Sequence, residues 1–266
     1  VMFNSFTPFS YPAVLFAVSG IATVLILPKE PSSAEQPNQL FDRSQVLDQL
    51  RPPAHAPEFS RVFAARTCMM AGVGLTGVFL WYLVRFWVYG KAVVLTSAPL
   101  TIPAGFLIAG MAVATLIGAA LASWAAGPIS ERIEEKNIPV ARVVAGACLL
   151  YAIGLGLAWG LGVWSTGTAR ENGMLLFALI SGFAFGIYDS LGLELVMDSL
   201  PDPRRAGHDL GIYALANSAG LALAAIIGAL LVNAFEHSFG YYLLFPSAIV
   251  MVLLAGIVTL TTKSAE

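Results

Sequence analysis

Charged residues are scarce in this sequence. Asp, Glu, Lys and Arg make up 11% of the 266 residues, whereas 58% are hydrophobic. A soluble domain has roughly one quarter charged residues, and a fold of this size has no way to hide so much apolar surface from water. The composition therefore excludes an ordinary soluble protein and indicates an integral membrane protein.

Concentrated positive charge and clustered metal ligands are lacking as well. The 14 Lys and Arg are scattered and the net charge is −2, so no basic face is available for nucleic acid. Cys68 and Cys148 fall inside apolar stretches and the three histidines lie far apart, which disfavours a disulfide or a metal site. The sequence has no nucleotide-binding or nucleophile motif. We expect no enzyme activity, no cofactor, no metal and no nucleic-acid partner.

Long apolar runs dominate what is present. A bilayer core of about 30 Å needs roughly 20 helical residues, because lipid offers backbone polar groups no other partner. Seven stretches qualify, at about 10–27, 62–89, 102–126, 140–164, 173–197, 210–234 and 241–262. We predict an all-α membrane protein with a helix in 1–28, a polar linker in 29–61 that is rich in proline, and a six-helix bundle in 62–266.

Basic residues are distributed unequally between the two sides of the predicted membrane. The smaller group is Arg85, Lys91 and Arg170, and the larger group comprises Lys29, Arg43, Arg51, Arg61, Arg66, Arg132, Lys136, Arg142, Arg204, Arg205 and Lys263. Loops rich in Lys and Arg stay in the cytoplasm. We therefore expect a multi-pass plasma-membrane protein with its N-terminus outside and its linker and C-terminus in the cytoplasm.

Three short motifs lie at helix junctions. The first is Gly127-Pro-Ile-Ser-Glu131-Arg132-Ile-Glu-Glu-Lys136, predicted as a loop. The second begins at Leu200-Pro-Asp and continues through Asp209-Leu-Gly to Ala-Asn217, and the third is Phe59-Ser-Arg-Val-Phe-Ala-Ala-Arg66. The first resembles the short cytoplasmic signature of the major facilitator superfamily, in its weaker copy between helices eight and nine. The others are similar to the junction of helices ten and eleven in bacterial, especially actinobacterial, members and to the entry into helix seven.

This resemblance implies a secondary transporter. The seven stretches then correspond to helices six to twelve, and the chain is expected to work with an N-terminal half that is missing here or with a separately encoded partner subunit. It would carry a small molecule of unknown identity by alternating access, as a symporter or an antiporter. The alternative is a seven-helix receptor, which would not bind retinal because 241–262 has no Lys.

One predicted span has acidic residues in its interior. Asp189 lies about 15 Å from the cytoplasmic end of its helix, near the depth at which secondary transporters bind substrates and ions. Together with the neighbouring Tyr188 it is our candidate for proton coupling or substrate binding; the alternative is a structural carboxyl bonded to a Ser or Tyr on an adjacent helix. Asn217, in an otherwise apolar helix, either faces the cavity or bonds a neighbouring helix.

The remaining polar candidates lie near the cytoplasmic ends. They would form a latch that pairs in one conformation and separates in another, and they are Gly127, Glu131, Arg132, Glu194, Asp198, Arg204 and Arg205. The alternative is that these charges only fix the topology. Arg85, among aromatic residues, is expected to lie in an interfacial belt, and the pairs Gly156-xxx-Gly160 and Gly182-xxx-Gly186 permit close helix contact.

Overall fold

A computed structural model describes residues 17–18, 20–21, 57–89, 102–164, 168–200, 206–234 and 237–262. The chain divides into two compact units, Val1–Val46 and Leu47–Glu266. In the first unit the four described residues are helical. The rest of the predicted span at 10–27 and most of the predicted linker lie outside the described residues, so those two predictions stay predictions.

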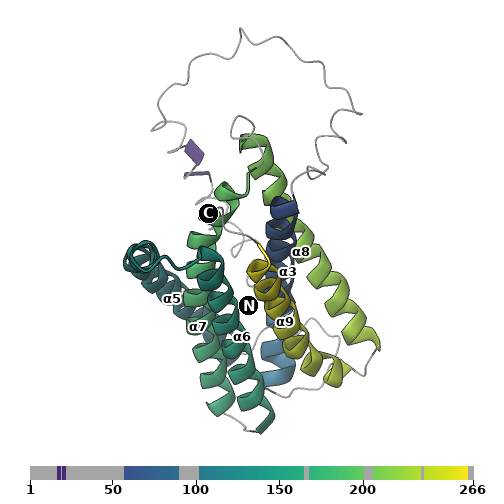
Figure 1. Ribbon diagram of the computed structural model, residues 1–266. Helices are drawn as coiled ribbons and strands as arrows, with labels where there is room; N and C mark the ends of the chain where they lie inside the picture. Colours follow the sequence, from purple (N-terminus) through teal and green to yellow (C-terminus); the bar gives the residue numbers. More distant parts are fainter. Residues whose placement is uncertain are drawn as a thin grey trace. The chain divides into compact units, whose positions relative to one another are not determined.

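The described part of the second unit is almost entirely helical (Figure 1). Its elements are α3 (Pro57–Gly77), α4 (Leu80–Tyr82), the π-helix η2 (Leu83–Val88), α5 (Ile102–Glu135), α6 (Val140–Trp164), α7 (Thr168–Asp198), α8 (Ala206–Ala234) and α9 (His237–Leu260). Six spans in this part of the chain are long and apolar enough to cross a membrane. The predicted all-α membrane fold is confirmed, and α6 has the bounds predicted for it.

The first span of the bundle starts early and is interrupted. It begins at Pro57, where a proline loses no helical hydrogen bond, and Glu58 suits the positive end of the helix. Arg61 pairs with Glu58 at 2.7 Å. Beyond Gly77 the chain turns, and α4 and the π-helix complete the crossing. Starting the span at Pro57 moves Arg66 from its predicted place in the cytoplasmic flank to the third turn of a helix.

The predicted loop at 127–136 is wrong, because α5 continues through most of it. This helix has 34 residues and is therefore about 50 Å long, well beyond the thickness of a bilayer core. Pro128 lies inside it without ending it. The chain reverses only at Asn137, which has a φ of 49° in the left-handed region that Asn tolerates.

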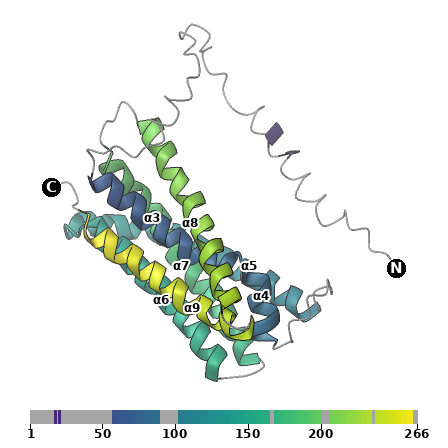
Figure 2. The same cartoon turned by 90° about the vertical axis from the view of Figure 1, so that its right-hand side faces the viewer.

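The long helices pack as two groups of three. In one group α7 packs against α5 and α6, in the other α3 packs against α8 and α9, and the main contact between the groups is that of α6 with α9 (Figures 1 and 2). Helices α3 and α7, from different groups, meet over a short length only. The buried core between them includes Met69, Leu75, Tyr151, Leu155 and Phe245.

Glycine brings α5 and α7 into direct backbone contact. A Cβ placed on Gly182 would collide with the backbone of Thr115, and one on Gly118 would collide with the carbonyl of Leu179. The predicted close contact at Gly182-xxx-Gly186 is therefore confirmed, since a Cβ on Gly186 also meets α5. The pair at 156 and 160 makes no such contact with another described helix.

Candidate functional site

Arg66 joins three helices through two polar contacts. Its Nη1 lies 2.8 Å from Oδ1 of Asp189 on α7, and its Nε donates to Oδ1 of Asn217 on α8 at 2.7 Å. Two residues singled out from the sequence, Asp189 and Asn217, therefore meet at a third that was assigned to the cytoplasmic flank. Asn217 was predicted either to face the cavity or to bond a neighbouring helix, and in the structure it accepts a hydrogen bond from Arg66 of α3.

Three aromatic rings surround the Arg66 guanidinium. Its central carbon lies 5.7 Å from the ring centre of Phe185, 5.6 Å from that of Tyr188 and 5.7 Å from that of Tyr213. At such distances the face of an aromatic ring attracts a cation. We call Phe185, Tyr188 and Tyr213 the aromatic cage. Together with Asp189 and Asn217, the cage replaces the interactions with water that the buried Arg66 side chain lacks.

The two charges of the ion pair are exposed to very different degrees. The side chain of Arg66 is 9% exposed, whereas that of Asp189 is 57% exposed. Asp189 is therefore neither buried nor unpaired, and its partner is Arg66 on α3. Because a charged group facing lipid costs several kcal/mol, the open side of this carboxylate requires water or another polar partner.

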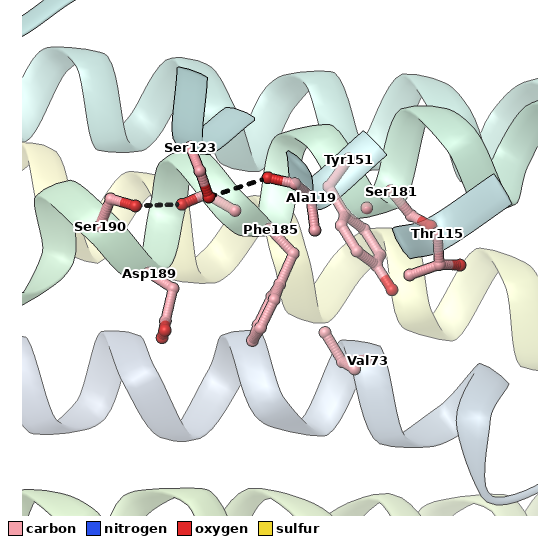
Figure 3. Close-up of a pocket in the computed structure, with 11 residues that line it drawn as sticks. Val73, Thr115, Ala119, Ser123, Tyr151, Ser181, Phe185, Asp189 and Ser190 are labelled. Atoms are coloured by element: carbon pink, nitrogen blue, oxygen red, sulfur yellow. Dashed lines mark hydrogen bonds between the residues drawn. The ribbon is translucent and has the colours of Figure 1, made fainter. Parts of the chain in front are cut away.

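Asp189 lies at one end of a cavity of about 390 Å³, which we call the polar cavity (Figure 3). Helices α3, α5, α6 and α7 line it with Val73, Thr115, Ala119, Ser123, Tyr151, Ser181, Gly182, Phe185, Gly186, Asp189 and Ser190. Among these described residues Asp189 alone is charged. A molecule entering the polar cavity thus meets a carboxylate, hydroxyl groups and aromatic rings, while the guanidinium stays inside its cage.

A second cavity adjoins the first. It has a volume of about 270 Å³ and shares Val73, Thr115, Tyr151 and Ser181 with the polar cavity. Most of its other lining is apolar and comes from both sides of the turn between α3 and α4, from Gly77 to Leu83, and from Met111, Phe177 and Phe245. We call it the apolar cavity. The interrupted span therefore adjoins the candidate site.

No ion pair joins the predicted latch residues in the described part of the chain. Gly127, Glu131 and Arg132 are exposed on the last turns of α5, and neither of the two charged residues has an ion-pair partner among the described residues. Glu194 and Asp198 are exposed near the end of α7. Arg204 and Arg205 lie outside the described residues, so the latch remains a prediction.

Arg85 lies in the π-helix beside the aromatic residues expected around it. Its guanidinium carbon is 5.7 Å from the ring centre of Phe86, and that ring stacks with Tyr82 and Tyr241. Arg85 and Arg66 are thus both basic residues next to aromatic rings, and Arg66 also has an acid and an amide as its partners. Sequence reasoning missed Arg66, and the signal that could have pointed to it is the acid at membrane depth on α7, which needs a compensating cation.

The described part of the chain has six membrane-length helices, and three of them meet at the ion pair of Arg66 and Asp189, which defines a polytopic membrane protein with a polar site in its bundle. The family model described as Major Facilitator Superfamily matches residues 111–266, which is more than half of the chain. The chain therefore belongs to the major facilitator superfamily and is a membrane transporter. No curated protein and no solved structure matches it.

Proposed function

We propose that the chain is the C-terminal part of a secondary transporter that couples the movement of a small molecule to that of protons. The observation that supports this is the ion pair between Arg66 and Asp189, in which the carboxylate is open to the polar cavity and the guanidinium is enclosed. A proton can reach the exposed carboxylate without disturbing the cage. Asp189 then acts as the proton-coupling residue, while Tyr188 and Asn217 hold Arg66 in place.

Protonation of Asp189 would change how two groups of helices are tied together. The ion pair links α3 to α7, which meet over a short length only. A neutral Asp189 loses the charge attraction to Arg66. Asn217 and Tyr213 still hold Arg66 on α8, and the other two rings of the aromatic cage still contact it from α7. Proton binding therefore weakens the link between α3 and α7 while α6 and α9 keep the two groups together, and such a change in the balance between conformations is what alternating access uses.

The polar exposed side of the bundle supports a second helical partner. Asp189, Ser190 and Ser123 are exposed on α7 and α5, and a membrane protein does not turn such a surface toward lipid. We propose that an N-terminal half or a separate subunit covers this side and encloses the substrate path. The protein would lie in the plasma membrane with its C-terminus in the cytoplasm.

The cytoplasmic latch belongs to the same proposal. Glu131 and Arg132 end α5, and Glu194 and Asp198 lie near the end of α7, the helix that packs along it. Charges on these two ends are free to pair with a partner bundle in one conformation and to release it in another.

Transport by the full-length protein in liposomes tests the coupling. A thermal-stabilisation screen first identifies a ligand, because a molecule that binds the folded state raises its melting temperature. We expect a pH gradient to drive accumulation of that ligand by the unmodified protein. Asp189→Asn should still exchange the ligand across the membrane but should not accumulate it, and Glu171→Gln, on the same helix, should behave like the unmodified protein. Accumulation that ignores both the pH gradient and Asp189→Asn would exclude proton coupling through this residue.

A further inference from the structure

We infer that the polar and apolar cavities together take an amphipathic amine: a cationic hydrogen-bond donor beside Asp189, with an apolar body that extends into the apolar cavity. The inference names a substrate class for the transporter proposed above, and its consequence for transport rests on that proposal. The binding site itself is argued from the residues that line the two cavities.

The exposed charge at this site is negative. Asp189 is the charged residue of the polar cavity lining, with more than half of its side chain exposed, whereas Arg66 is enclosed. Arg66 also uses Nη1 and Nε on Asp189 and Asn217, and three rings cover it. An anionic ligand therefore meets a carboxylate before it meets a guanidinium, which disfavours anions and favours cations.

The Ser and Thr hydroxyl groups of the polar cavity present acceptors to a ligand. A hydroxyl has one hydrogen to donate and two lone pairs that accept. Each of the four Ser and Thr hydroxyls already donates its hydrogen to a carbonyl of its own helix. Thr115 donates to Met111 at 2.9 Å and Ser181 to Ala178 at 3.1 Å. Ser123 donates to Ala119 at 3.1 Å and Ser190 to Gly186 at 2.8 Å (Figure 3). The oxygen lone pairs of these hydroxyls are therefore left to accept hydrogen bonds from a ligand.

A protonated amine matches this set of groups better than a polyol or an acid. An ammonium group has hydrogens to donate and no acceptor that needs a donor from the protein. A polyol would need several donors as well as acceptors. The four Ser and Thr hydroxyls have already used theirs, which leaves the Tyr151 hydroxyl as the donor among the described lining residues. The cationic head therefore lies beside Asp189 and the neighbouring Ser190.

The rest of the ligand is apolar because of what adjoins the polar cavity. Val73, Thr115, Tyr151 and Ser181 line both cavities, so one molecule can contact the two. The wall of the apolar cavity adds Leu80, Ile108, Met111, Met174 and Phe177. The volumes of about 390 and 270 Å³ suit a ligand with one aromatic or aliphatic group at the end of a short chain.

Binding of three matched compounds to the full-length protein in nanodiscs tests this inference. The compounds are 4-phenylbutylamine, 4-phenylbutanol and 4-phenylbutyrate, which share the apolar body and differ in the head group. We expect the amine to bind at least about tenfold more tightly than the alcohol and the acid to bind most weakly, since a charge-assisted contact is worth roughly that factor. Asp189→Asn should remove the preference for the amine, and Glu171→Gln, outside both cavities, should retain it.

The single variant Asp189→Asn leaves Arg66 enclosed without its acid and is at risk of folding poorly. The double variant Arg66→Gln with Asp189→Asn removes both charges and serves as the second test; it should bind the amine and the alcohol about equally. Equal binding of all three compounds by the unmodified protein overturns the inference, as does an amine preference that survives in the double variant. If the amine binds through Asp189 but no pH gradient drives its uptake, the substrate class stands and the proton-coupling proposal fails. If a pH gradient drives uptake of another ligand and the protein shows no preference for the amine, the proton-coupling proposal stands and the substrate class fails.

Discussion

The two members of the ion pair should contribute unequally to the stability of the fold, and the cost of replacing one of them should depend on whether the other is present. Asp189→Asn leaves a guanidinium that is 9% exposed without its counter-charge, which typically costs about 3–5 kcal/mol for a buried pair. Because Asp189 is itself 57% exposed, we expect the lower end of this range. Arg66→Gln instead leaves an acid that is already open to water, and its cost comes from the lost aromatic cage contacts and the bond to Asn217.

The double variant separates these contributions. Once Arg66 is Gln, Asp189→Asn removes no charge pair and should cost less than about 1 kcal/mol. The interaction energy between the two positions should therefore be about 2 kcal/mol, and the double variant should be more stable than the sum of the single effects predicts. Reversible unfolding of the four proteins in mixed micelles, followed by tryptophan fluorescence, measures this quantity. Additive effects within about 0.5 kcal/mol would show that the pair contributes nothing to the fold and would refute the reasoning.

Three further predictions follow from the packing and the topology. Gly182→Ala should destabilise the protein by about 1–3 kcal/mol in thermal unfolding because its methyl group meets α5 backbone, whereas Gly156→Ala, with open space around it, should be neutral or slightly stabilising; equal effects would contradict the α5 and α7 contact. Tyr213→Leu should cost about 0.5–2 kcal/mol more than Tyr213→Phe in the same measurement, because only the leucine loses the ring over the guanidinium. In a background without other cysteines, a membrane-impermeant thiol reagent should label Trp164→Cys but not Thr261→Cys in intact cells, and the reverse pattern would invert the proposed orientation.

The sequence predicted the class of fold because apolar length is a local property. Each span at membrane depth has to satisfy its own backbone, so its composition alone marks it. Boundaries were less predictable: the Gly127 and Pro128 pair is typical of a turn, yet α5 continues past the membrane thickness and ends where Asn137 adopts a left-handed conformation. Nothing in a local window sets how far a helix extends into water.

The candidate site was predictable only in part, for a related reason. Asp189 and Asn217 stand out because each is a polar side chain in an apolar run. Arg66 does not, because an Arg near a helix end is usually a topological marker, and its partners come from α7 and α8, far away in the sequence. Only the packing of α3, α7 and α8 shows that Arg66 is the enclosed member of an ion pair and not a basic residue that marks the cytoplasmic side.

The interruption of the first bundle span gives its two ends different neighbours. Arg66, on the α3 side of the turn, is tied to α7 and α8, while Trp87 of η2 packs against Tyr242 and Phe245 of α9 and closes over Gly162 of α6. A straight helix would pass any tilt of one end to the other. With a turn at Val78 and Phe79, the end that holds the charge can follow α8 while the other end keeps its place on α6 and α9. The first bundle span therefore consists of two helical pieces joined by a turn, and this turn lies beside the apolar cavity.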